Sequence, residues 1–126
     1  MVETPPRHAA VRTLAMPADT NPAGDIFGGW LMAQMDIAGG IVAHNRAGGR
    51  VATVAVDGMA FHHPVLVGDV VACYADVVRI GRTSITVAIE TMVERGAATL
   101  KVTQATFVYV ALDDHGRPRP VPDARK

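Results

Sequence analysis

The 126-residue chain is poor in cysteine and in aromatic side chains. Its single cysteine, Cys73, cannot form a disulfide within the chain and lies in the apolar stretch VVACYADVV, where a buried thiol is expected. Only 5% of the residues are aromatic, so small and branched side chains have to form the core. A domain of this size often gains further burial by associating with copies of itself.

The sequence also lacks an excess of charge and lacks long apolar runs. Twelve basic residues balance twelve acidic ones, which argues against binding to nucleic acid. No apolar run approaches the roughly 20 residues that span a bilayer, and the opening MVETPPRHAAVR has no apolar core of a signal peptide. We therefore expect a soluble, cytoplasmic protein that binds neither nucleic acid nor membrane.

Several familiar catalytic motifs are missing as well. The sequence contains no G-x-S-x-G elbow, no H-E-x-x-H, no C-x-x-C and no glycine-rich phosphate-binding motif. These absences remove support from serine hydrolases, zinc proteases and nucleotide-cofactor enzymes. His62 and His63 are adjacent, and successive side chains of an extended chain point to opposite faces, so the two cannot easily share a metal. We therefore predict no metal site.

Proline-bearing ends flank one compact unit. We predict an N-terminal tail over residues 1–10, a single α+β domain over 11–112 and an extended C-terminal tail over 113–126. Apolar periodicity predicts one helix from Gly28 to about Arg46. Strand-forming residues predict strands at 11–16, 50–57, 70–79, 84–94 and 99–112. The short connections favour an antiparallel meander with the helix lying across it.

The predicted helix has two different faces. Its apolar stripe consists of Leu31, Met35, Ala38 and Val42, widened by Trp30, Ile37 and Ile41. Its opposite face consists of Gly29, Ala33, Asp36, Gly40 and Ala43. This second face is small except for one carboxylate. It indicates either close packing against another backbone, with Asp36 incidental, or a narrow channel that runs past Asp36.

The segment from Asp19 to Asp36 contains groups that suit acyl hydrolysis without a serine or a metal. Gly28 and Gly29 leave backbone N–H groups uncovered at the positive end of the helix dipole, where they can stabilise an oxyanion. Asp36 is two turns further along and can activate water, and the Asn21 amide can bind a water or a carbonyl. Taken alone, an Asn-Pro pair is equally typical of a turn, and a Gly-Gly pair is equally typical of close packing.

Three blocks of the sequence resemble a known family. They are MPADTNPAGDIFGGWLMAQMD, GRVATVAVDGMAFHHPVLVGDVV and VRIGRTS, in that order. Together they resemble the YciA-type acyl-CoA thioesterases of the hotdog superfamily, over residues 12 to 122. The resemblance implies a hotdog fold, in which a curved five-stranded antiparallel sheet of order 1-3-4-5-2 wraps one long helix.

The resemblance also implies an assembly and a set of site residues. Protomers are expected to pair through the edge strand at 50–57, as a homodimer at minimum and a hexamer built as a trimer of dimers, with sites at the dimer interface. The catalytic groups implied are Asp36, the Asn21 amide and the Gly28 and Gly29 backbone. The coenzyme A contacts implied are Phe61, His62, Gly81, Arg82, Thr83 and Ser84.

The expected reaction is hydrolysis of an acyl-CoA thioester to a carboxylic acid and free coenzyme A. No cofactor is expected, because coenzyme A is part of the substrate and product. Asp36 can act as general base or attack directly to form a mixed anhydride, and the sequence leaves both open. An acyl-CoA-binding sensor or carrier is the alternative, although it would not need Asn21 and Asp36. A hydratase generally needs an acid/base pair that includes a suitably placed histidine. His44 is a poor candidate, because it lies far along the predicted helix from Asp36.

Overall fold

The structure is a computed structural model that describes residues 7–123, so residues 1–6 of the predicted N-terminal tail and 124–126 of the predicted C-terminal tail lie outside the described residues. The elements in chain order are β1 (Val11–Leu14), the 3-10 helix η1 (Pro17–Asp19), α1 (Gly28–Ala47), β2 (Val51–Phe61), β3 (Val70–Ile80), β4 (Ser84–Arg95) and β5 (Ala98–Ala111). The predicted helix and all five predicted strands are confirmed. No helix among the described residues is both long and apolar enough to cross a membrane.

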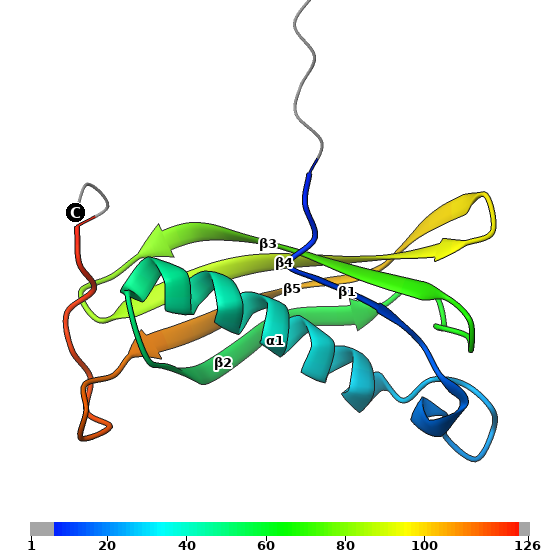
Figure 1. The fold of residues 1–126 in the computed structure, drawn as a ribbon, viewed down its shortest axis with the longest axis horizontal. Coiled ribbons are helices and arrows are strands. Elements are labelled where there is room, and N and C mark those ends of the chain that lie inside the picture. The colour runs from blue at the N-terminus through cyan, green and yellow to red at the C-terminus, as the bar shows by residue number, and fades with distance from the viewer. Residues whose placement is uncertain (1–6, 124–126) are drawn as a thin grey trace, which may run out of the picture.

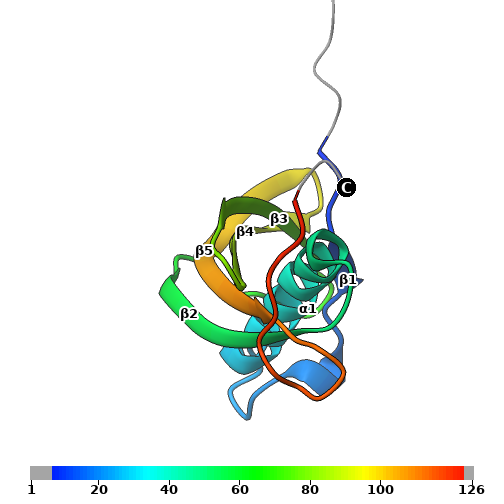
Figure 2. The same cartoon turned by 90° about the vertical axis from the view of Figure 1, so that its left-hand side faces the viewer.

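One curved antiparallel sheet wraps around the single long helix (Figures 1 and 2). The strand order is β1-β3-β4-β5-β2, which confirms the predicted hotdog topology. β2 therefore forms one edge of the sheet. It continues to Phe61, beyond the predicted end at Asp57, because bulges near Thr53 and Gly58 let the strand bend and keep its pairing with β5.

The core lies between the concave face of the sheet and the helix. β4 alternates between buried and partly exposed residues along its whole length, as its sequence predicts. Ile85, Val87, Ile89 and Val93 are fully buried and belong to the same core as Leu31 and other residues of α1. Small and branched side chains therefore fill most of the interior.

The buried face of α1 differs from the predicted stripe in one respect. Leu31, Met35 and Ala38 are buried, as expected. Ile37 and Ile41, predicted to widen this stripe, are 52% and 43% exposed in the single chain, so that prediction is wrong. The physical reason is that the helix turns its small residues toward the sheet: Gly39, Ala43 and Ala47 are buried on that side.

The C-terminal end of α1 is closed by the chain that follows β5. Gly48 adopts φ of 71°, and its N–H donates to His44 O, so this glycine ends the helix. Arg119 Nη2 donates to Ala47 O at 2.9 Å, and Arg46 Nη1 donates to Pro122 O at 2.7 Å. The described part of the C-terminal segment makes a turn over residues 113–117, where Gly116 N–H donates to Asp113 O at 3.0 Å, and then continues to the helix end, where it is anchored.

Candidate active site

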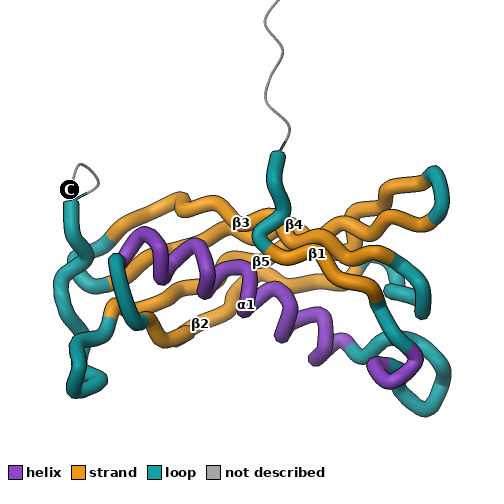
Figure 3. The backbone as a smooth tube through the Cα atoms, in the orientation of Figure 1, coloured by secondary structure: helices purple, strands orange, loops and turns teal. Residues whose placement is uncertain are grey.

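A structured loop leads from β1 into α1 (Figure 3). Asn21 organises this loop: its Oδ1 accepts hydrogen bonds from the N–H groups of Ala23 at 3.0 Å and Asp25 at 3.1 Å. Gly24 takes φ of 93°, which completes the turn. The Asn21 side-chain NH2 has no acceptor among residues 7–123, so it is available to a ligand.

The first turn of α1 presents free backbone donors. Phe27 is the N-cap residue and provides no side-chain cap, and the first helical hydrogen bond runs from Leu31 N–H to Phe27 O at 3.3 Å. No residue in the described range accepts from the N–H groups of Gly28, Gly29 and Trp30. A Cβ at Gly29 would meet nothing within 4 Å, so there is open space beside the first turn, and free N–H groups at a helix start are suited to bind an oxygen.

Asp36 is held by donors from two strands. Its Oδ1 accepts from Thr53 Oγ1 on β2 at 2.6 Å and from the Tyr109 hydroxyl on β5 at 3.0 Å. Burial, followed by the charge of Asp36, raises the pKa of Tyr109, so the phenol remains a donor. Sequence reasoning missed both partners. Alternation along β5 could have placed Tyr109 on the helix-facing side, but nothing in the sequence indicates which helical residue it meets.

A cavity of about 230 Å³ lies beside Asp36. It is lined by Gly29, Met32, Ala33, Asp36, Thr53, Val56 and Phe107. The small side of the helix therefore leaves open space next to the carboxylate, which supports the channel interpretation over close packing. The space follows only the first half of the helix, since Ala43 is buried and Gly40 faces the Tyr109 ring.

A second cavity, of about 330 Å³, opens at the start of the helix. Its lining is mostly apolar and consists of Ile26, Phe27, Gly28, Leu31, Phe61, His62, His63, Pro64 and Val65. A Cβ at Gly28 would lie 3.5 Å from the Phe61 ring, so the glycine leaves room for that ring. The structure thus brings Phe61 and His62 together with the helix start.

The turn between β3 and β4 lies elsewhere. Gly81 N–H donates to Ser84 O at 2.8 Å, and Thr83 O accepts from Ala111 N–H at 2.9 Å, while the Arg82 side chain is exposed. Ala111 pairs with Val51, at the opposite end of β2 from Phe61. Ten residues of strand at about 3.3 Å each separate these ends by roughly 33 Å. Within one chain, the two predicted coenzyme A segments are therefore not brought together.

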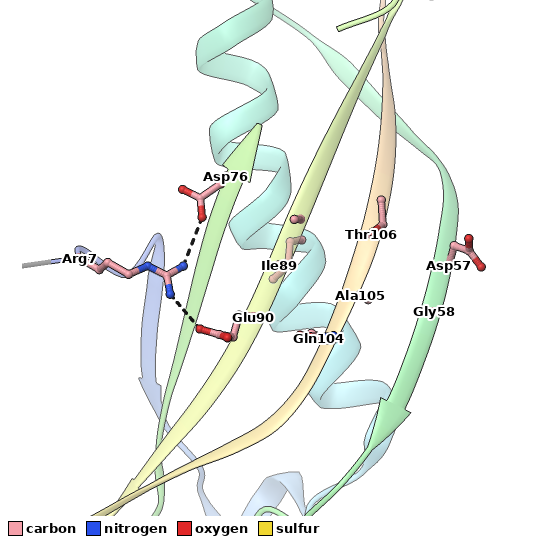
Figure 4. A pocket seen from close by; sticks show the side chains of 10 residues that line it. Arg7, Asp57, Gly58, Asp76, Ile89, Glu90, Gln104, Ala105 and Thr106 are labelled. Atoms are coloured by element: carbon pink, nitrogen blue, oxygen red, sulfur yellow. Dashed lines mark hydrogen bonds and ion pairs between the residues drawn. The ribbon is translucent and has the colours of Figure 1, made fainter. Parts of the chain in front are cut away.

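Other polar features do not form a competing centre. A hollow of about 460 Å³ lies on the outer face of the sheet, where Arg7 bridges Asp76 at 3.3 Å and Glu90 at 2.8 Å (Figure 4). It includes neither Asp36 nor the helix start. Over residues 7–123, no three His, Cys, Asp or Glu side chains gather as metal ligands would. Cys73 is buried, as predicted, and burial raises the pKa of its thiol.

Known proteins resemble this chain in sequence and fold. The thioesterase superfamily model matches residues 23–104. The acyl-CoA thioester hydrolase YciA of Salmonella typhimurium is 56% identical over 127 residues, covering 97% of this chain and 96% of the relative. A hexameric thioesterase from Yersinia pestis superposes with a TM-score of 0.90 at 55% identity, covering 96% of this chain and all of the other.

A more distant structure carries ligands. The acyl-CoA hydrolase from Staphylococcus aureus, solved in complex with butyryl coenzyme A, coenzyme A and coenzyme A disulfide, has a TM-score of 0.82 at 32% identity. The match covers 89% of this chain and 70% of that one. Sequence identity and fold agree over nearly the full length of the chain. The chain therefore belongs to the thioesterase superfamily and, within it, to the YciA-type acyl-CoA thioester hydrolases.

Proposed function

We propose that the protein hydrolyses acyl-CoA thioesters to a carboxylic acid and free coenzyme A. The observation that carries this proposal is the Asp36 carboxylate, which borders a cavity that also reaches Gly29 at the uncapped start of α1. A carboxylate and a set of free backbone donors are the two groups that thioester hydrolysis needs without a nucleophilic serine or a metal. The YciA relative from Salmonella typhimurium, an acyl-CoA thioester hydrolase, supports the substrate class.

The backbone at the helix start would bind the thioester carbonyl. The N–H groups of Gly28 and Gly29 are free, and the helix dipole adds positive potential at that end. Negative charge that develops on the carbonyl oxygen would meet these fixed donors, which are already oriented before the reaction. The free NH2 of Asn21 is the proposed donor that orients the carbonyl or the attacking water.

Asp36 would act as the general base. It takes a proton from water, the water oxygen forms a bond to the carbonyl carbon, and the carbon–sulfur bond then breaks as the thiolate leaves. The proton on Asp36 is transferred to that thiolate, so the carboxylate is regenerated. Direct attack by Asp36 would instead give a mixed anhydride. A single turnover in ¹⁸O-water detects the anhydride route in which water attacks the Asp36 carbonyl carbon, because ¹⁸O then stays on Asp36 and the first product acid carries an enzyme oxygen instead.

We propose that the working form is an oligomer, a hexamer like the thioesterase from Yersinia pestis. β2 is an edge strand, and apolar residues beside it are exposed in the single chain: Val54, Val56, Ile37 and Ile41. Pairing through β2 would cover them. A coenzyme A site that uses both Phe61 and Arg82 would take them from different subunits, because one chain holds them at opposite ends of β2.

No resident cofactor is proposed, since coenzyme A enters with the substrate, and the cytoplasm is the proposed compartment. The test is an assay of thiol release over a panel of acyl-CoAs from acetyl to palmitoyl. We expect release of one thiol per thioester consumed. Binding of acyl-CoA without thiol release would indicate the sensor or carrier alternative. Hydration of an enoyl-CoA without thiol release would indicate a hydratase.

A further inference from the structure

Tyr109 connects β5 to Asp36 through its hydroxyl group. The side chain is only 1% exposed and its ring centroid lies 6.3 Å from that of Phe107, so packing fixes its position. The hydroxyl oxygen is 3.0 Å from Asp36 Oδ1 and 3.0 Å from the Asp36 backbone oxygen. A single phenol therefore contacts both the side chain and the main chain of the same residue.

Toward Asp36, the Tyr109 phenol is the donor. Burial raises the pKa of Tyr109, and the negative charge of Asp36 raises it further, so the hydroxyl keeps its proton over the pH range of an enzyme assay. An ionised carboxylate accepts hydrogen bonds and donates none. The hydroxyl therefore fixes the direction in which the Asp36 carboxylate points.

Gly39 provides the space for this contact. It follows Asp36 by three residues and lies one helical turn further along α1. A Cβ at this position would overlap the Tyr109 hydroxyl and would lie 2.7 Å from Ile89 Cδ1. The missing side chain thus lets the phenol reach the helix backbone beside Asp36.

The two oxygens of the Asp36 carboxylate have different surroundings. Oδ1 accepts from both Thr53 and Tyr109, whereas no donor within residues 7–123 contacts Oδ2. Held at one oxygen, the carboxylate has the other free for water in the adjoining cavity. We propose that Tyr109 is a positioning residue that holds the Asp36 carboxylate in the orientation needed to take a proton from water. This inference rests on the proposed role of Asp36 as general base.

Tyr109→Phe tests the inference, because it removes the hydroxyl and keeps the ring. We expect kcat to fall about ten- to hundredfold, with KM changed by less than about threefold, since a misdirected base slows the chemical step.

Tyr74→Phe is the matched control. Tyr74 is the only other tyrosine, and its ring lies under the Arg7 guanidinium, 4.4 Å from ring centroid to Cζ, away from Asp36. Its kcat and KM should equal those of the wild type. Gly39→Ala is a second variant, which displaces the phenol without deleting it, and it should also lower kcat with little change in KM. Circular dichroism and light scattering check that each variant folds and assembles.

A double mutant separates positioning from a general structural role. If Tyr109 acts through Asp36, then Tyr109→Phe should cause no further loss of kcat in an Asp36→Asn background. A Tyr109→Phe enzyme with wild-type kcat, while Asp36→Asn is inactive, would overturn the positioning role alone. Equal loss of kcat in both backgrounds would also overturn it. Full activity of Asp36→Asn would remove the proposed base, and the positioning role with it.

Discussion

The Thr53 hydroxyl donates a 2.6 Å hydrogen bond to Asp36 Oδ1 and thereby joins the edge strand β2 to the central helix. The candidate base is therefore held by a strand whose other edge is free in the single chain. Any shift of β2 that accompanies the pairing of two copies would be transmitted to the carboxylate. Assembly and catalysis are for this reason expected to depend on each other.

Asp36→Asn should lower kcat by at least about a hundredfold, because an amide cannot act as a general base. The fold should persist, since the amide oxygen can still accept from Thr53 and Tyr109. Thiol release from acetyl-CoA and a melting curve measure the two effects. Asp114→Asn, in an exposed turn, is the matched control and should be fully active. Near-normal activity of Asp36→Asn would contradict the assignment.

Arg82→Ala should weaken recognition of coenzyme A and spare the chemical step. Its exposed guanidinium lies in the turn between β3 and β4, so water screens any phosphate contact, and we expect KM to rise by up to roughly tenfold with kcat unchanged. An N-acetylcysteamine thioester lacks the phosphates and should be hydrolysed equally by both enzymes. If Arg82→Ala is equally impaired on that substrate, the residue supports the fold instead.

Val54→Asp should disrupt assembly. Val54 lies on β2 and is 57% exposed in the single chain, so a charge there would be buried if two copies pair through this strand. Light scattering should show species smaller than a hexamer, with reduced thiol release. Val67→Asp, in a loop and 46% exposed, is the control and should leave the assembly intact. A Val54→Asp protein of unchanged size and activity would argue against β2 as the interface.

Asp69 should make the stability of the fold dependent on pH. Its buried carboxylate accepts from Arg95 and from Leu66 N–H, and the Arg95 hydrogen bond holds its pKa below the ordinary value. A lowered pKa stabilises the fold at pH above the unfolded value of about 3.9. That stabilisation is lost as pH falls through the lowered folded value.

Asp69→Asn should consequently reduce the free energy of unfolding by roughly 1 to 2 kcal/mol at pH 7, and the difference from wild type should shrink toward pH 2. Urea unfolding at several pH values measures this. Asp76→Asn serves as the comparison, because its ion pair with Arg7 is exposed and should contribute much less. A loss that is equal at every pH would show that the charge of Asp69 is not the cause.

Sequence patterns predicted the elements well, because apolar periodicity and turn residues are local signals. The helix was predicted from Gly28 to about Arg46 and extends one residue further, and β4 matches within one residue. The prediction that was wrong concerns how one element packs against another. The exposure of Ile37 and Ile41 depends on how α1 is rotated against the sheet, and no local pattern encodes that rotation.

The candidate site was predictable only in part, for the same reason. Asp36 was identified from its place on a small-residue face and from the family resemblance, and the structure places it beside a cavity. Thr53 and Tyr109 were missed, because their contact with Asp36 depends on the register between α1 and strands far away in sequence. A threonine in an edge strand and a tyrosine in a core strand are otherwise ordinary.

The irregular course of β2 also bears on the solubility of the protein. A straight, exposed edge strand can recruit further strands without limit, as in amyloid fibrils. β2 is interrupted by two bulges and by Gly58 at φ of 73°, so a partner has to match its bend. The opposite edge, β1, offers only four residues. Both features limit the addition of further strands, which protects the protein from fibrillar aggregation.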